Sequence, residues 1–266
     1  MAERTRRPME VKKRYTVLTY IFNGYEKVHE VGDKDPEADY VLVTDNSGLK
    51  SEMWRVVYDP MPTKSPFGKC YEVRFHPFRY ASTPIVVRID GSVEVKQSLK
   101  PLVDEFERGR YDRCVMIHPH RNVLKDEYDV WIKTRHYPAD QAQRCMKAME
   151  RMGYDLQQRG MIQGCFEIVR DSRVNHDLND LTFGLLALMG NGRIERLDQT
   201  VTSFTLQRFF PKMRLMCVAE DIITDGNLMQ WYIHNSNTPI PLKTNTIPPV
   251  LFGKPQTLFQ PIRKGK

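Results

Sequence analysis

Short apolar runs alternate with longer amphipathic stretches along most of the chain. Runs rich in β-branched and aromatic residues, bounded by turn residues, predict strands over 15–22, 40–44, 54–58, 85–89, 114–117, 165–169 and 213–218. Apolar positions at helical spacing predict helices over 67–80, 98–108, 138–152, 175–189 and 198–208. Strands that alternate with helices are typical of α/β proteins, so we expect a mostly parallel sheet flanked by helices.

The two ends of the chain differ in composition from its centre. Residues 1–13 are basic and predict a disordered tail, whereas residues 239–266 are rich in proline and predict an extended or disordered C-terminal tail. We therefore expect a single domain over 14–238. A chain of 266 residues is long enough for such a domain to bury a sizeable core.

Composition excludes several classes of protein. No run of about 18 apolar residues is present, and the N-terminal residues lack the apolar segment of a signal peptide, so we expect neither a membrane span nor secretion. The five cysteines are widely spaced and form no C-x-x-C pair. This pattern favours a reducing cytoplasm over a disulfide framework or a structural zinc site.

The chain is basic, with a net charge of +7 from 40 Lys and Arg against 33 Asp and Glu. Part of this charge is clustered near both ends. Because no zinc-finger spacing or aromatic RNA-binding signature accompanies it, we expect no nucleic-acid partner. A phosphorylated substrate or an anionic membrane surface stays open, and so does the alternative of solvated basic tails.

Polar residues follow three of the predicted strands at the point where each strand ends. Asn23-Gly24-Tyr25 follows the first strand, Asp45 the second and Asp90-Gly91-Ser92 the fourth. The carboxyl ends of parallel strands share one edge, where open α/β sheets bind ligands, so these residues are expected to converge. Asp90 could hold a divalent cation or a sugar nucleotide. Alternatively it only caps the turn, because Asp-Gly is a common turn pair.

Other candidate residues are less specific. The chain contains no P-loop, no Rossmann glycine motif and no G-x-S-x-G elbow. His118-Pro119-His120-Arg121 follows a predicted strand and His234 lies in an aromatic segment, but a lone histidine is more often structural than a ligand. Asp198 precedes a predicted helix, where it could be a plain N-cap. The residues alone therefore predict a ligand-binding α/β protein with a possible cation site.

Seven short motifs, taken in order, resemble the TOD/MUCI-type glycosyltransferase-like family, which includes plant mucilage-related and ceramidase-labelled proteins and many bacterial relatives. The resemblance covers about residues 14–237. The motifs are Tyr15–Glu26, Asp39–Asn46, Lys69–Pro77, Ile89–Ser92, His118–Arg121, Gly160–Arg170 and Arg196–Gln199. The resemblance implies a Rossmann-related GT-A fold and a hexosyltransferase-like enzyme. It also implies a nucleotide-sugar donor, with a UDP-sugar favoured, and a hydroxyl acceptor on a glycan or lipid-linked glycan.

The order of motifs is also similar, more distantly, to retaining enzymes of the galactosyltransferase and glycogenin type. Those enzymes carry a helical Arg before a D-x-D strand end, a small-residue segment, an Asp-Gln pair and a C-terminal His. The positions that match here are Arg74, Gln163-Gly164, Asp198-Gln199 and His234. The similarity implies transfer with retention of anomeric configuration.

A metal ion is also implied by this similarity. Asp90 and His234 are the expected ligands of Mn²⁺ or Mg²⁺ on the donor diphosphate. Arg88, however, occupies the first position of the D-x-D motif. Either the metal has few protein ligands, or Arg88 itself faces the phosphates and weakens the need for a metal.

The resemblance assigns further residues to the two substrates. Asp198 and Gln199 are expected beneath the donor sugar, where they stabilise an oxocarbenium-like transition state. On the acceptor side we expect His118, His120 and Arg121. The expected donor-binding residues are Tyr20, Asn23, Gly24, Tyr25, Asp45, Lys69, Arg74, Arg88, Gly91, Ser92, Gln163 and Gly164.

Bacterial relatives imply a role in cell-surface polysaccharide or lipopolysaccharide synthesis, in the cytoplasm or at the inner membrane face. There the basic, aromatic C-terminal tail could contact anionic lipid. The rival interpretation is a non-catalytic nucleotide-sugar or glycan-binding protein with a degenerate GT-A site, and Arg88 favours it. A hydrolase is a third interpretation, although no nucleophile elbow or zinc signature supports it.

Overall fold

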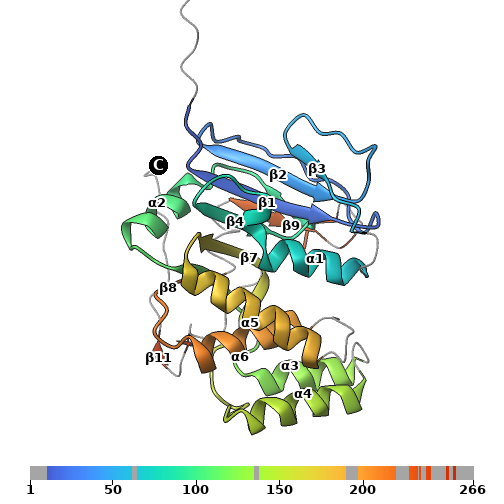
Figure 1. Ribbon diagram of the computed structural model, residues 1–266, viewed down its shortest axis with the longest axis vertical. Helices are drawn as coiled ribbons and strands as arrows, with labels where there is room; N and C mark the ends of the chain where they lie inside the picture. Colours follow the sequence, from blue (N-terminus) through green and yellow to red (C-terminus); the bar gives the residue numbers. More distant parts are fainter. Residues whose placement is uncertain are drawn as a thin grey trace, which may run out of the picture.

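The computed structural model describes residues 11–61, 65–134, 138–189, 197–219, 228–232, 234, 238–240, 250–251 and 254–255 (Figure 1). The strands are β1 Tyr15–Ile21, β2 Ala38–Thr44, β3 Arg55–Tyr58, β4 Ile85–Ile89, β5 Val93–Val95, β6 Arg113–Ile117, β7 Ile162–Arg170, β8 Leu215–Val218, β9 Met229–Trp231, β10 Val250–Leu251 and β11 Lys254–Pro255. The helices are α1 Pro66–Phe75, the 3-10 helix η1 Pro77–Arg79, α2 Lys100–Arg108, α3 Leu124–Lys133, α4 Ala139–Arg151, α5 Arg173–Met189 and α6 Asp198–Phe209.

Seven strands form one sheet in the order β3-β2-β1-β4-β7-β6-β8. β1 pairs in parallel with β2 and β4, and β2 pairs in parallel with β3. β7 is antiparallel to both β4 and β6, whereas β8 is parallel to β6. Within this sheet, as the structure describes it, β7 alone runs against the other strands. The prediction of an α/β fold with a mostly parallel sheet flanked by helices is confirmed.

Side chains alternate between the two faces of the sheet, as the pleat requires. On β1, Tyr15 and Val17 belong to a core that includes Leu102 and Phe106 of α2. The next residues along, such as Leu18, belong to a second core on the other face, with Val73 of α1. The sheet is therefore buried on both faces, which explains why its strands are near-continuous apolar runs.

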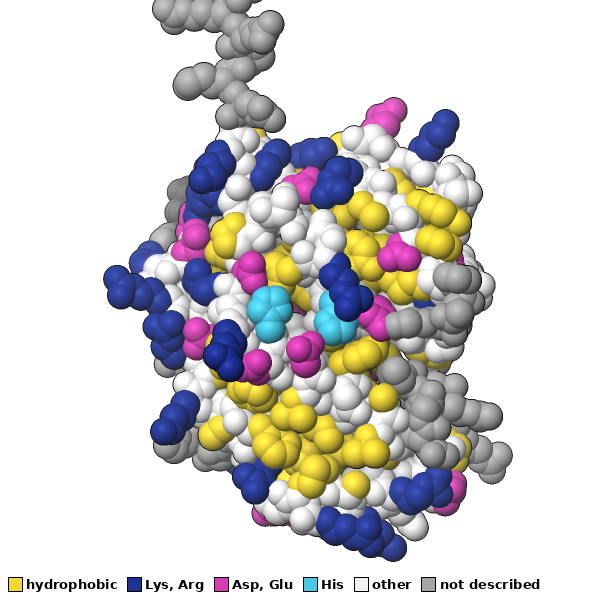
Figure 2. Space-filling view, viewed as in Figure 1, with side chains coloured by type: hydrophobic (Ala, Val, Ile, Leu, Met, Phe, Trp, Pro, Cys, Tyr) yellow, Lys and Arg dark blue, Asp and Glu magenta, His cyan; other side chains and the backbone are white. Residues whose placement is uncertain are grey.

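Helices on the second face form a layer of their own. In Figure 1, α5 and α6 lie below the sheet and α3 and α4 lie further from it. Their apolar sides meet in a core that includes Leu124 of α3, Cys145 of α4, Leu186 of α5 and Phe204 of α6. Figure 2, viewed from the same side, shows charged and hydrophobic side chains interspersed over the upper half and a gathering of hydrophobic side chains in the lower half. Leu188 of α5, which is 75% exposed, is one of the exposed apolar residues.

The structure corrects several predicted elements. The helix predicted over 67–80 divides into α1 and η1, because Pro77 cannot continue the hydrogen bonding of a helix. Helix α3 was not predicted, since charged residues make up half of it and interrupt its apolar positions. The short strands β5 and β9 were also missed. They pair with each other in an antiparallel ladder that no local pattern reveals.

The predicted tails lie largely outside the described residues. Of the segment 1–13, only residues 11–13 are described, and they form no regular element. In the C-terminal segment, the backbone N–H of Ile240 donates to the Trp231 carbonyl at 2.8 Å. β10 and β11 form a small antiparallel pair. The start of the C-terminal segment is thus hydrogen-bonded to β9.

All five cysteines are free thiols. Three of them, Cys114, Cys145 and Cys217, are buried in the hydrophobic cores. Among the helices that the structure describes, none combines the length and the apolar character needed to cross a bilayer.

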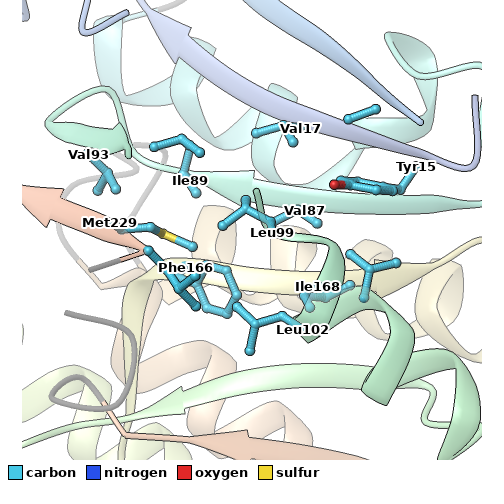
Figure 3. Packing of buried hydrophobic residues seen from close by; sticks show 14 of the residues in the cluster. Tyr15, Val17, Val87, Ile89, Val93, Leu99, Leu102, Phe166, Ile168 and Met229 are labelled. Carbon is cyan, nitrogen blue, oxygen red and sulfur yellow. The ribbon is translucent and has the colours of Figure 1, made fainter. Parts of the chain in front are cut away.

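The packing of the antiparallel strand β7 against the core can be tested by mutation. Phe166 of β7 is 1% exposed and lies among side chains of β4, α2 and β9 (Figure 3). We expect Phe166→Ala to lower the free energy of unfolding by about 3–5 kcal/mol, because it leaves a cavity that the core cannot fill. Leu188→Ala, at an exposed position, is the control and should change it by about 0.5 kcal/mol or less. Urea denaturation measures both, and similar losses in the two variants would contradict this packing.

Candidate functional site

The order of the strands reverses between β1 and β4. β2 and β3 lie on one side of β1, and β4 and the later strands lie on the other. Loops that leave the carboxyl ends of two such strands turn in opposite directions, which opens a crevice where α/β sheets bind ligands. The predicted residues after β1, β2 and β4 all lie at this edge.

Asp45, at the end of β2, links two neighbouring segments of this edge. Its Oδ1 accepts the backbone N–H of Asn23 at 2.8 Å, and its Oδ2 lies 2.6 Å from Lys69 Nζ of α1. Asn23 and Gly24 both adopt positive φ, at 56° and 62°, a turn that suits Asn-Gly. Burial opposes ionisation of Asp45, but the Lys69 ammonium and the Asn23 N–H outweigh it and lower the pKa of its carboxyl.

Asp90, just after β4, is held by two polar groups. Its Oδ1 accepts from Arg88 Nη1 at 2.9 Å and from the Tyr20 hydroxyl at 3.2 Å. The Asp90 side chain is 36% exposed, whereas that of Arg88 is only 1% exposed. Burial and the charge of Asp90 raise the pKa of Tyr20 well above its usual value, so its hydroxyl stays protonated and can donate.

A buried ion network supports this arrangement from below. Arg88 of β4 and Glu167 of β7 are direct cross-strand partners, with Arg88 Nε 2.7 Å from Glu167 Oε1. On the next strand, Arg113 Nε donates to Glu167 Oε2 at 2.8 Å. Arg74 Nε of α1 lies 3.5 Å from Glu167 Oε1. One carboxylate therefore lies among three arginines, all of them buried.

The charge state of Glu167 follows from these contacts. Burial alone would raise its pKa, but the surrounding arginines outweigh burial and lower it to about 2. Arg113 also donates to the side-chain oxygens of Asn175, at 3.3 Å, and Asn179, at 2.9 Å, both on α5. The network therefore ties the sheet to α1 and α5.

Asp198, the first residue of α6, joins the same network. It forms an ion pair with Arg74, and its Oδ1 accepts from the Tyr71 hydroxyl at 3.1 Å. Gly164 of β7 lies against this pair. A Cβ at Gly164 would lie 2.8 Å from Asp198 Oδ2 and 2.9 Å from Arg74 Nη1, so only glycine fits here without a shift.

Two amide oxygens, on the residues next to Gly164 and Asp198 in the chain, lack partners among the described residues. Oε1 of Gln163 and Oε1 of Gln199 are buried and have no hydrogen-bond partner among the described residues. Buried acceptors of this kind usually find a donor in the protein, in water or in a ligand. A ligand rich in hydroxyl groups could supply such donors.

The three residues predicted on the acceptor side form one cluster at the end of β6. His118 Nδ1 accepts the backbone N–H groups of His120 and Arg121, each at 3.1 Å. Arg121 pairs with Glu127 in the first turn of α3. Burial raises the pKa of Glu127, Arg121 opposes the rise, and the charge of Asp198 adds to it. The cluster and Asp198 are therefore within electrostatic reach of each other.

The remaining predicted residues, Tyr25 and His234, meet above the end of β1. Their rings lie 5.0 Å apart, and His234 Nδ1 contacts a Glu26 carboxylate oxygen. A Cβ at Gly91 would lie 3.3 Å from Glu26 Cγ, which places Glu26 beside the turn that follows β4. Ser92, also in this turn, is buried, and its carbonyl accepts the N–H of Tyr232 at 3.0 Å.

These residues fit a divalent cation poorly. In the described ranges, no group of three or more His, Cys, Asp or Glu side chains is arranged to hold a metal ion. Of the two expected ligands, Asp90 is paired with Arg88, and His234 with Glu26. Metal binding at this edge stays a prediction, and no chemical step is derived from it.

The structure therefore brings the predicted donor residues together, but it also adds residues that were not predicted. Glu167 and Arg113 are central to the ion network. The available signals were a charged residue inside the apolar run 165–169 and another directly before the run 114–117. Cys70 is another addition. Burial and the charges of Asp90, Asp198 and Asp45 raise the pKa of its thiol to about 12, so the thiol is neutral at this site.

Two surface cavities lie apart from this edge. One, of about 400 Å³, is lined by residues of α4 and of the segment that follows it, Tyr154 among them. The other, of about 510 Å³, lies beside the end of α6 and is lined by Phe209 and Met213. Neither contains a predicted site residue, so we place the candidate site at the β1 and β4 ends.

The ion network predicts a pH-dependent loss of stability. Glu167→Gln should lower the free energy of unfolding by about 3–5 kcal/mol at pH 7, because three buried arginines lose their shared counter-ion. The pKa of Glu167 is lower in the folded chain than its ordinary value of 4.5, so the unfolded chain takes up the proton first as the pH falls. The stabilisation is therefore present above about pH 5 and is lost towards pH 2.

Urea denaturation between pH 7 and pH 3 measures this effect. The difference between the parent and Glu167→Gln should shrink as the pH falls, whereas Glu107→Gln, at an exposed ion pair, should differ from the parent by about 1 kcal/mol or less throughout. A difference for Glu167→Gln that stays constant over this range would contradict the assignment of an ionised Glu167.

No model of a known protein family matches the chain, and no curated protein matches it. The resemblance to the TOD/MUCI-type family is therefore carried by the short motifs alone and stays a prediction.

Proposed function

We propose that the protein is a GT-A glycosyltransferase that moves a sugar from a nucleotide-sugar donor to a hydroxyl of a glycan or glycolipid. The observation that carries the proposal is the meeting of Asp45, Lys69, Asp90 and Asp198 around the carboxyl ends of β1, β2 and β4. These residues come from separate elements, and a strand-order reversal is where an α/β sheet offers a ligand crevice. A UDP-sugar is the favoured donor.

The nucleoside end of the donor is assigned to the β1 and β2 ends. Tyr25 is 48% exposed and offers an aromatic face for a base. Asp45 offers carboxylate oxygens to ribose or base N–H and O–H groups. Lys69 pairs with Asp45 at 2.6 Å and keeps 11% of its side chain exposed, so it is the residue that we assign to the diphosphate.

The sugar is assigned to the other end of the crevice, beside Asp198. The carboxylate is fixed by Arg74 and Tyr71, so it is oriented before the donor binds. A fixed negative charge stabilises the positive charge that develops on the sugar ring as the glycosidic bond breaks. The unpartnered oxygens of Gln163 and Gln199 would accept hydrogen bonds from sugar hydroxyls.

The reaction forms one bond and breaks another at the anomeric carbon. The bond to the diphosphate oxygen breaks, and its electron pair leaves with the nucleoside diphosphate. The acceptor oxygen forms the new bond, and its proton passes to the departing diphosphate. Retention requires the acceptor to enter on the same face as the leaving group, which is the side that we assign to His118, His120 and Arg121.

We place this reaction in the cytoplasm, where it would serve cell-surface polysaccharide or lipopolysaccharide synthesis at the inner membrane face. The basic C-terminal residues that would contact anionic lipid lie outside the described residues. Five free cysteines are consistent with a reducing compartment.

A second candidate is a nucleotide-sugar or glycan-binding protein without catalysis. The observation that favours it is the pairing of each site carboxylate with a basic neighbour: Asp45 with Lys69, Asp90 with Arg88 and Asp198 with Arg74. Carboxylates that are each paired with a cation can accept hydrogen bonds from the hydroxyl groups of a ligand without removing a proton from any of them.

Release of nucleoside diphosphate from a panel of UDP- and GDP-sugars tests the proposal. We expect one donor to be hydrolysed, and Asp198→Asn to slow its hydrolysis by about 100-fold or more, because the fixed charge beneath the sugar is lost. Asp104→Asn is the matched control and should leave the rate unchanged, because Asp104 pairs with Arg14 and Lys100 on α2's side of the molecule.

Three other results of these experiments would change the proposal. Thermal stabilisation by a nucleotide sugar without turnover would favour the non-catalytic binding protein. NMR of the product anomer tests retention, and an inverted product would remove the role given to Asp198. If no donor is bound or hydrolysed, the proposed function is wrong.

A further inference from the structure

Arg88 is the residue that departs from the expected metal motif, and its contacts are fully internal. Nε donates to Glu167, Nη1 to Tyr20 and Asp90, and Nη2 to the Gly164 carbonyl. Four of the five guanidinium N–H donors are thus engaged with the protein. Arg88 therefore cannot reach a diphosphate directly, and its charge acts on Asp90 instead.

This contact changes what Asp90 can bind. Arg88 already serves as the counter-ion of the Asp90 carboxylate, with Nη1 2.9 Å from Oδ1. A divalent cation on the same carboxylate would lie close to a buried guanidinium that cannot lose its proton, and the two would repel each other. Magnesium and manganese also need several oxygen ligands, and among the described residues no group of three or more His, Cys, Asp or Glu side chains is arranged to hold a metal ion.

The other oxygen of Asp90 is available. Oδ2 has no hydrogen-bond partner among the described residues, and the side chain is one-third exposed, just after the carboxyl end of β4. A carboxylate held by an arginine and a tyrosine on one oxygen presents the other in a fixed direction. That geometry suits a hydroxyl donor on a ligand.

We propose that Asp90, positioned by Arg88 and Tyr20, binds a hydroxyl of the donor directly through Oδ2, and that the protein binds its nucleotide sugar without a divalent cation. This inference rests on the proposed function, because it concerns the same site. The hydroxyl belongs either to the ribose or to the transferred sugar. Arg88 is a positioning residue here, and Asp90 is a binding residue.

The first experiment measures binding and metal separately. Calorimetric titration with the nucleotide sugar that gives the largest thermal shift is done in EDTA and again in Mn²⁺. We expect dissociation constants within about threefold of each other. In parallel, the electron paramagnetic resonance signal of free Mn²⁺ should not decrease on adding the protein, beyond the decrease caused by the nucleotide sugar alone.

Two substitutions at Asp90 then separate a hydroxyl acceptor from a metal ligand. In Asp90→Asn the amide oxygen can still accept from Arg88 and Tyr20, and the amide nitrogen can still bond a hydroxyl oxygen. Affinity should therefore fall only about threefold to tenfold, as for one weakened hydrogen bond. Asp90→Ala removes both contacts and should weaken binding further, whereas Asp104→Asn should leave it unchanged.

Titration with UDP and GDP alone identifies the hydroxyl. If Asp90→Ala weakens binding of the nucleoside diphosphate as much as that of the nucleotide sugar, the hydroxyl is on the ribose. If only the nucleotide sugar is affected, the hydroxyl is on the sugar. Equal affinity of the parent and Asp90→Ala for both ligands would overturn the assignment of Asp90.

The inference and the proposed function can fail separately. Binding that appears only with Mn²⁺, together with loss of bound Mn²⁺ in Asp90→Asn, would overturn the inference and leave the proposed function in place. Absence of binding to every nucleotide sugar, with and without Mn²⁺, would overturn both.

Discussion

Glu167 is a buried carboxylate that lies against Arg74, Arg88 and Arg113. Three guanidinium groups cannot be buried together without a counter-charge, because the cost of removing them from water is large and they repel one another. Glu167 comes from β7, the antiparallel strand, and reaches arginines on both neighbouring strands and on α1. Glu167 therefore stabilises both the pairing of β4, β7 and β6 and the placement of α1.

The candidate site inherits its geometry from that network. Each of two arginines uses its remaining donors to hold an aspartate at the edge of the sheet, Arg88 holding Asp90 and Arg74 holding Asp198. Asp90 and Asp198 are thus connected to the core through buried arginines. A ligand meets carboxylates whose directions are already fixed, and binding then costs little side-chain entropy.

The same network explains why a metal ion and this site are poorly matched. A D-x-D strand end offers two carboxylates and a net negative charge, whereas here the first position carries a buried cation. Arg88 makes Asp90 one half of an ion pair. In our proposal, Asp90 acts on the ligand as a hydrogen-bond acceptor.

Much of this architecture was predictable from the sequence. The apolar runs of β1, β2, β4 and β6 are long and sharply bounded, so the alternation of strands and helices, and the convergence of Asp45 with Asp90, followed from pattern alone. Glu167 was not identified, because a charged residue inside a strand has meaning only through partners on other strands. Helix α3 was hidden by its many charges, and β5 and β9 by a sequence separation that local patterns cannot bridge.

Hydrogen–deuterium exchange with and without a nucleotide sugar tests the central claim most directly, because it reports where a ligand binds whether or not any reaction follows. The account predicts slower exchange in peptides that contain residues 20–25, 44–47 and 89–93, at the carboxyl ends of β1, β2 and β4. Slower exchange confined to the cavities beside Tyr154 or Phe209, with these strand ends unchanged, would contradict it.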